Sequence, residues 1–164
     1  MKYTCKSLDE LRQCVYVFLG SNIRNTQNVR GQASNMGAKV VGLRGDLGSG
    51  KTTFTQMIAK ELGIEMPVLS PTFVLERIYK IEDSTCLPVR QGLKIQDFKY
   101  LIHIDAYRLE SADELKHLGW DDIASDPGNL ILIEWPERVA SAMPADMIYI
   151  DFKFVDETTR EISW

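Results

Sequence analysis

Apolar residues recur along the chain with two different periods, and these periods predict an alternation of helices and strands. Helical spacing predicts four helices: residues 7–19, residues 51–62, a short helix opened by Ser111 and Glu114, and a short helix around Val139. Ser7 and Glu10 have the spacing of a capping box, and Gly20 is expected to end the first helix.

Short apolar runs between turn residues predict the strands. These are residues 38–45, an extended segment within 68–81 after Pro71, and residues 100–105, 129–134, 147–154 and 160–164. The last two are expected to pair as a hairpin around residues 156–159. Strands that alternate with helices are typical of an α/β fold with a mainly parallel central sheet flanked by helices, here ending in a hairpin-like strand pair.

Two polar stretches, residues 21–37 and 83–99, interrupt this pattern and are predicted to be loops or insertions. The 164 residues, 45% of them apolar, suit a single domain over residues 1–164. No run of 18 apolar residues occurs, and residues 1–12 are polar and mixed in charge. Neither a membrane span nor a secretory signal is therefore expected, and we predict a cytoplasmic location.

Charge and cysteine content narrow the functional classes. The net charge of −4 argues against a protein that coats nucleic acid with a cationic face, but it permits a role in a nucleic-acid pathway through a protein partner. Cys5, Cys14 and Cys86 lack Cys-x-x-Cys spacing. We expect them to be reduced structural thiols rather than disulfide or zinc ligands.

Residues 45–52, GDLGSGKT, match the phosphate-loop pattern G-x-x-x-x-G-K-[ST] at every fixed position, between a predicted strand and a predicted helix. Glycines let the backbone wrap round phosphates, with its N–H groups turned inward at a helix N-terminus. Lys51 is expected to reach the β- and γ-phosphates, and the Thr52 hydroxyl to complete a magnesium shell. The motif predicts a P-loop NTPase domain, with a flexible glycine turn as the alternative.

Two carboxylates end apolar strands: Asp105 closes LIHID and Glu134 closes LILIE. Acidic groups at such strand ends help hold Mg²⁺ and orient water in nucleotide hydrolases. Spacing leaves open which of the two is nearer the metal. His103 is interpreted as a packed residue behind the site rather than a base, and His117 as solvated. Trp135 is either core or part of a segment that moves with nucleotide state.

Two motifs that are missing from the sequence help to choose among classes of nucleotide-binding protein. There is no Asn-Lys pair, so the Asn-Lys-x-Asp motif expected of a guanine-specific GTPase is missing. No arginine-rich lid that would clamp a phosphoryl acceptor is apparent. An ATPase is favoured; a small-molecule or nucleoside kinase, and a nucleotide-gated binding module with negligible hydrolysis, stay open.

Five motifs in a fixed order resemble one family. GDLGSGKTTF, SPTFVL, HIDAYRL, DELKHLGWDDI and LIEWPER are similar to the bacterial TsaE family, formerly YjeE, over most of residues 40–144. The resemblance implies a Mg²⁺-dependent ATPase with a small phosphate-loop α/β fold that works with TsaB and TsaD. Together these install threonylcarbamoyl on the adenosine next to the anticodon of tRNAs that read codons beginning with A. The chain would thus meet tRNA only through that complex.

The resemblance also implies roles for individual residues. Nucleotide contacts are expected from Asp46, Gly48, Ser49, Gly50, Lys51, Thr52, Thr53 and Arg160. Thr52 and Glu134 are expected to contact magnesium, and Asp105, Glu134 and Lys51 to serve hydrolysis. Ser70, Thr72 and Trp135 are expected to lie in nucleotide-sensing switches that also meet the partners.

Overall fold

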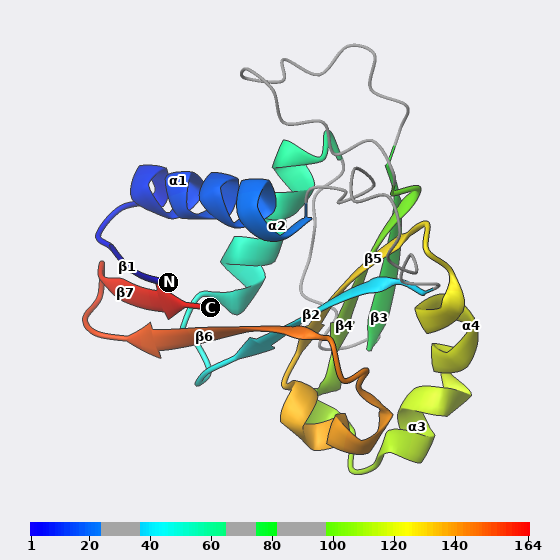
Figure 1. The fold of residues 1–164 in the computed structure, drawn as a ribbon. Helices are drawn as coiled ribbons and strands as arrows, with labels where there is room; N and C mark the ends of the chain where they lie inside the picture. The colour runs from blue at the N-terminus through cyan, green and yellow to red at the C-terminus, as the bar shows by residue number, and fades with distance from the viewer. Residues whose placement is uncertain (24–36, 65–74, 82–97) are drawn as a thin grey trace.

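A seven-stranded sheet with helices on both faces forms the centre of the molecule (Figure 1). The computed structural model describes residues 1–23, 37–64, 75–81 and 98–164. The strands are β1 (Lys2–Cys5), β2 (Lys39–Arg44), β3 (Glu76–Lys80), β4 (Tyr100–Asp105), β5 (Asn129–Glu134), β6 (Ile148–Phe154) and β7 (Arg160–Ser163). Their order across the sheet is β1-β7-β6-β2-β5-β4-β3.

The helices divide between the two faces of the sheet (Figure 1). One face carries α1 (Leu8–Phe18), its π-helical continuation η1 (Leu19–Ile23) and α2 (Lys51–Glu61). The other carries the short elements η2 (Ala106–Arg108), α3 (Ala112–His117), α4 (Trp120–Ser125) and η3 (Pro136–Ala142). The expected α/β class is confirmed.

Parallel pairing is confined to the middle of the sheet. The strands β6, β2, β5 and β4 are parallel neighbours, whereas β1 and β7 at one edge and β3 at the other pair antiparallel. The predicted β6–β7 hairpin is present, and the Asp156 side chain accepts hydrogen bonds from the backbone N–H groups of Thr158 and Thr159 in its turn. The sheet is therefore mixed, with a parallel centre.

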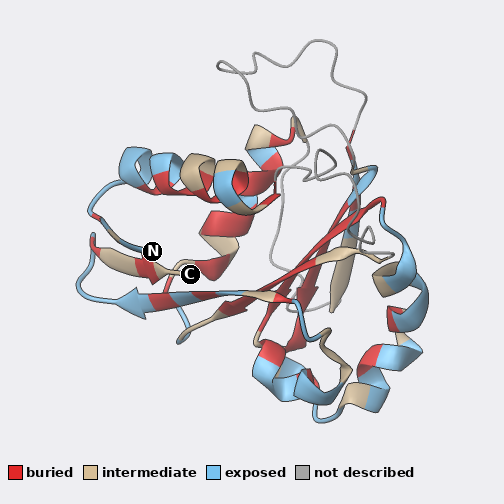
Figure 2. Cartoon of the chain, viewed as in Figure 1, coloured by how far each residue is buried: buried red, intermediate tan, exposed pale blue. Residues whose placement is uncertain are grey.

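The core lies on both sides of β5, whose six residues are all buried (Figure 2). Because side chains alternate along a strand, Leu130 and Leu132 pack toward α1 and α2, and Ile131 and Ile133 pack toward the short helices. A strand covered on both faces reads as a continuous apolar run, which is why this segment is the most apolar in the sequence.

The structure agrees with the predicted N-termini of the helices better than with their predicted C-termini. Ser7 accepts a hydrogen bond from the N–H of Glu10 at 3.2 Å, and Gly63, with φ of 77°, follows α2 as expected. Gly20 does not end the first helix, because the chain continues through it as η1. The single helix predicted after Ser111 is two helices, separated where Gly119 takes φ of 82°.

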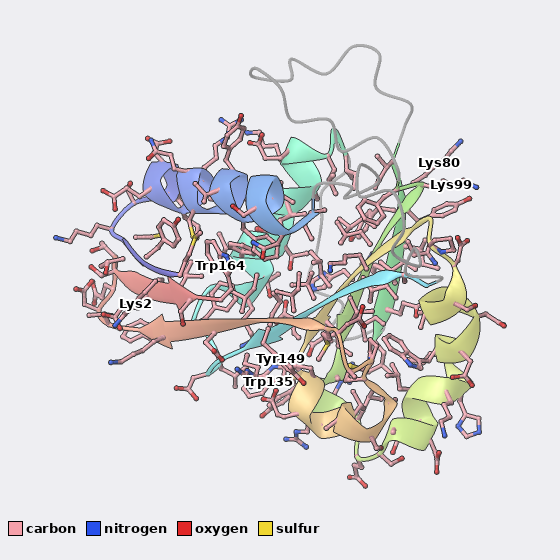
Figure 3. All side chains as sticks on the ribbon, viewed as in Figure 1. Lys2, Lys80, Lys99, Trp135, Tyr149 and Trp164 are labelled. Atoms are coloured by element: carbon pink, nitrogen blue, oxygen red, sulfur yellow. The ribbon has the colours of Figure 1, made fainter. Side chains whose placement is uncertain are left out.

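Strand β1 was not predicted from the sequence. It has only four residues, and its partner β7 lies at the opposite end of the chain. Trp164 lies at this corner (Figure 3). Its ring stacks on Tyr3 at 4.9 Å and meets the Phe18 ring edge-on at 5.4 Å. Pairing between the two chain ends leaves no local pattern in the sequence.

Cys5 and Cys14 are buried free thiols, as expected, and burial raises the pKa of Cys14 to about 12. Cys86 lies outside the described residues, as do residues 24–36 and 83–97 of the two polar stretches. Among the helices of the described ranges, none has the length and apolar character that crossing a membrane requires.

Glu76 supplies a pH-dependent test of this fold. The side chain is half-buried in β3, its Oε2 has no hydrogen-bond partner among the described residues, and burial raises the pKa of the carboxyl group. A raised pKa means that the folded state loses stability as pH rises above about 4.3, the value for an unfolded glutamate. Glu76→Gln should therefore be more stable than wild type at pH 7, and the difference should vanish below pH ~4.

Urea unfolding at the two pH values measures this difference, and Glu110→Gln, at an exposed position, is the matched control. A stabilisation of Glu76→Gln that was equal at both pH values would contradict the explanation.

Candidate functional site

The loop between β2 and α2 has positive φ at three positions, and glycine occupies all three. Gly45 has φ of 140°, and a Cβ there would lie 2.3 Å from the carbonyl oxygen of Phe152. Gly48 and Gly50 also have positive φ, at 73° and 104°, and Gly50 is the N-cap of α2. The loop thus passes from the end of a buried strand to the N-terminus of a helix, where backbone N–H groups are unpaired.

A pocket of about 270 Å³ opens over this loop. Its lining comprises Leu47, Gly48, Ser49, Gly50, Lys51, Thr52, Thr53, Asp105, Tyr107, Glu134 and Trp135. The structure therefore brings together most residues that the sequence pointed to, from α2, β4 and β5. Asp46 is an exception: it does not line the pocket, and its carbonyl oxygen accepts a hydrogen bond from Lys51.

Lys51 is folded back onto its own loop. Its Nζ donates to the carbonyl oxygens of Gly45 at 2.6 Å and Asp46 at 2.9 Å, and lies 4.2 Å from the centroid of the Trp135 ring. The ammonium group therefore bonds to two neutral carbonyl oxygens, and the cation–π contact holds it toward the pocket.

Burial lowers the pKa of Lys51 from its ordinary value. Four carboxylates act in the opposite direction, in the order Glu134, Asp105, Glu137 and Asp46. The surroundings of Lys51 are thus strongly acidic, and desolvation still outweighs their attraction.

Glu134 is the carboxylate that contacts the phosphate loop. Its Oε1 accepts a hydrogen bond from the Thr52 hydroxyl at 2.8 Å and lies 3.0 Å from Nε2 of the fully buried His103. Asp105 is paired with Glu134 in the register of β4 and β5. The Oδ1 atom of Asp105 accepts a hydrogen bond from the backbone N–H of Tyr107. Of the two strand-end carboxylates, Glu134 is therefore the one that contacts Thr52.

Trp135 follows Glu134 in a left-handed conformation, with φ of 58°. Its backbone N–H donates to the carbonyl oxygen of Leu43 at 3.2 Å, and its ring centroid lies 5.2 Å from that of Tyr107. Such a backbone is strained for a bulky residue. Tyr107 was not predicted as a site residue, because it lies in a short turn after β4 that has no periodicity of its own.

A second pocket adjoins the first across the loop. Gly48, Gly50 and Thr53 line both, and the second is completed by Cys5, Lys6, Ser7, Leu8, Leu11, Glu157, Thr158 and Arg160. Arg160 donates from Nη2 to the carbonyl oxygen of Gly48 at 3.3 Å, so the structure places this residue beside the loop. The contribution of residues 5–11 was missed, since their approach to the loop depends on the unpredicted strand β1.

Two residues expected in a switch, Ser70 and Thr72, lie outside the described residues. His117 is exposed on α3, as interpreted from the sequence, and His103 is packed behind the site.

Comparison with known proteins places this geometry in a family. The model of the family described as "Threonylcarbamoyl adenosine biosynthesis protein TsaE" matches residues 21–162. The chain belongs to the TsaE family. The match includes the phosphate loop, Asp105, Glu134 and Arg160, and leaves out β1 and α1.

Individual TsaE relatives agree with this assignment. The tRNA threonylcarbamoyladenosine biosynthesis protein TsaE of Rickettsia felis is 35% identical over 122 residues, which cover 74% of this chain and 61% of that protein. The protein of the same name from Bacillus subtilis is 36% identical over 125 residues, covering 76% of this chain and 68% of that protein. A crystal structure of Bacillus subtilis YdiB matches 99% of this chain and 82% of its own, with a TM-score of 0.65 and 25% identity.

The glycine conformations in this TsaE-family loop predict a contrast between two substitutions. Gly45→Ala should destabilise the protein by about 1–3 kcal/mol through backbone strain, and further through its clash with Phe152. Gly48→Ala should cost only about 1–2 kcal/mol, because its φ is left-handed but nothing lies within 4 Å of the added Cβ. Chemical denaturation of both variants measures the contrast, and equal losses of stability would contradict the role assigned to Phe152.

Proposed function

We propose that this chain binds ATP with Mg²⁺ and hydrolyses it, as the ATPase subunit of a threonylcarbamoyl-tRNA machinery. The observation that carries the proposal is the 2.8 Å hydrogen bond between the Thr52 hydroxyl and Glu134, inside a pocket formed by a glycine-rich phosphate loop. Family membership supports the pathway, because the relatives are named for tRNA threonylcarbamoyladenosine biosynthesis.

The phosphate loop would hold the triphosphate. Backbone N–H groups at the start of α2 attract anions, and Lys51 would exchange its two carbonyl partners for phosphate oxygens. This exchange favours binding, since an ammonium interacts more strongly with charged phosphate than with a neutral carbonyl.

The donor set fits magnesium. Thr52 and Glu134 place a hydroxyl and a carboxylate oxygen within hydrogen-bond distance of each other, and Mg²⁺ prefers such oxygen ligands, together with phosphates and water. The charge around Lys51 gives a second reason. Two carboxylates, Asp105 and Glu134, line the pocket beside the single lysine, and a divalent cation would offset their repulsion of a triphosphate. When bound, the metal would neutralise charge that develops on the transferred phosphoryl group.

Hydrolysis would use the two strand-end carboxylates. Asp105 lies beside Glu134 in the register of β4 and β5 and is buried at the pocket wall. A carboxylate there can accept a hydrogen bond from water and orient it toward the phosphate. Lys51 would stabilise the charge on the phosphate oxygens.

The second pocket suits the nucleoside. It continues from the loop through Gly48, Gly50 and Thr53, and Leu8 and Leu11 give it an apolar wall that would support a flat base. Arg160, beside Gly48, is placed to reach the phosphate or the ribose.

The proposed partners are TsaB and TsaD, and tRNA would be reached through their complex. An acidic protein with a net charge of −4 is suited to a protein partner more than to direct coating of RNA. Trp135 is suited to a nucleotide-sensing switch. Its ring contacts Lys51 and it directly follows Glu134, so movement of Lys51 or Glu134 would displace Trp135.

Two substitutions separate nucleotide binding from hydrolysis. Lys51→Ala should remove measurable ATP binding, because the loop loses its cation. Glu134→Ala should spare nucleotide binding more than hydrolysis. Affinity should fall only to the level measured without Mg²⁺, whereas turnover should fall about 100-fold or more, since the variant leaves Thr52 without its partner at the metal. Binding by calorimetry and release of inorganic phosphate measure the two effects, with Glu110→Gln as the exposed control.

Unimpaired turnover in both variants would contradict the assignment. Transfer of labelled γ-phosphate to an acceptor other than water would instead support a kinase, and binding without single-turnover hydrolysis would support a nucleotide-gated binding module.

A second experiment tests the pathway. In the presence of ATP and Mg²⁺ the chain should co-purify with TsaB and TsaD, and it should increase the number of tRNA molecules modified per complex. Lys51→Ala, which lacks the nucleotide cation, is the matched negative control. Absence of binding to these partners, together with no effect on repeated tRNA modification, would refute the proposed role.

A further inference from the structure

His103 is a polar side chain in an apolar row. Alternation along β4 places Leu101, His103 and Asp105 on the face that α1 and α2 cover. The imidazole is 0% exposed, and its Nδ1 has no hydrogen-bond partner among the described residues. A buried polar atom without a partner lowers stability and calls for a physical explanation.

A leucine at this position would avoid that cost. It would fill a similar volume next to Leu101 and opposite Leu132, and it would bury no unpaired nitrogen. Within the described ranges, the recorded hydrogen bond of His103 is the one to Glu134. A functional advantage that offsets the cost of the unpaired nitrogen would therefore act through Glu134.

Both hydrogen bonds of Glu134 end on the same oxygen. Thr52 Oγ1 lies 2.8 Å from Oε1 and His103 Nε2 lies 3.0 Å from it, whereas Oε2 has no hydrogen bond to the described residues. An ionised carboxylate only accepts hydrogen bonds, so the ring nitrogen facing it carries the hydrogen. The geometry fits a ring with hydrogen on Nε2, which donates to Oε1.

We propose that His103 is the positioning residue for the magnesium ligand Glu134. Its Nε2–H holds Oε1 against the Thr52 hydroxyl, which fixes the rotation of the carboxylate and leaves Oε2 for the cation. His103 itself touches neither metal nor nucleotide. Partners of this kind orient the groups that ligate a metal, and their loss weakens binding without removing a ligand. The inference rests on the proposed MgATP site.

The test compares His103→Leu with His103→Gln. Leucine keeps the packing and removes the donor, whereas the glutamine amide can place an N–H near the position of Nε2. ADP affinity is measured by calorimetry with Mg²⁺ and with a chelator. His103→Leu should bind ADP about 10- to 100-fold more weakly than wild type in Mg²⁺ and equally well in chelator. His103→Gln should recover most of the affinity. His117→Leu, at an exposed histidine of α3, should match wild type throughout.

The outcomes separate this inference from the proposed function. Wild-type affinity that does not depend on Mg²⁺ would refute the magnesium site itself. A Mg²⁺-dependent wild type with an unaffected His103→Leu variant would refute only the positioning role. Equal losses with and without Mg²⁺ would also overturn it, because they would indicate a purely structural residue.

A measurement on the wild-type protein keeps the inference testable if a variant fails to fold. Nitrogen NMR of the His103 ring should show hydrogen on Nε2 and none on Nδ1. Adding Mg²⁺ to the ADP-bound protein should shift the Nε2 signal, whereas the His117 signals should stay unchanged. A ring protonated on Nδ1 alone would overturn the proposal.

Discussion

The parallel register of β2, β5 and β4 is the constraint on which the site depends. It sets Leu43 beside Glu134 and Glu134 beside Asp105, so that the carboxyl ends of three buried strands meet at one edge of the sheet. The loop after β2 begins at this edge, and α2 packs on the face of the sheet that carries Leu130 and Leu132. A one-residue slip in the pairing would turn Glu134 to the opposite face, away from Thr52. Such a slip would be costly, because it would bury the Glu134 carboxylate among the apolar residues under the short helices, away from Thr52 and His103.

The same register explains why a buried acidic site is tolerated. Each carboxylate at the strand ends has a defined donor: Thr52 and His103 for Glu134, and the N–H of Tyr107 for Asp105. Hydrogen bonds to the ionised form offset part of the cost of removing charge from water. The lysine among them is held by backbone carbonyls and an aromatic ring. Every charged group that lines the pocket thus has a defined partner within the protein.

Local sequence patterns predicted the parts of the molecule that local forces determine. The phosphate loop, the capping of α1 by Ser7 and the strand ending at Glu134 each depend on neighbouring residues. By contrast, β1 depends on a partner at the other end of the chain, and its position brings residues 5–11 to the second pocket. The continuation of the chain through Gly20 has a similar cause, because tertiary packing of Leu19 and Ile23 overrides the stop signal.

The candidate site likewise has features that local sequence patterns predict and features that depend on tertiary contacts. Glu134 and Asp105 were predictable as strand ends, yet the choice between them required the 2.8 Å contact with Thr52, which joins residues 82 positions apart. Asp46 lies within the motif, but it does not line the pocket, and its carbonyl oxygen accepts a hydrogen bond from Lys51. A sequence motif specifies a backbone path, and the side chains that face the ligand follow from how that path meets the neighbouring strands. Contacts between strands and helices, rather than the motif alone, therefore decide which carboxylate lies beside Thr52.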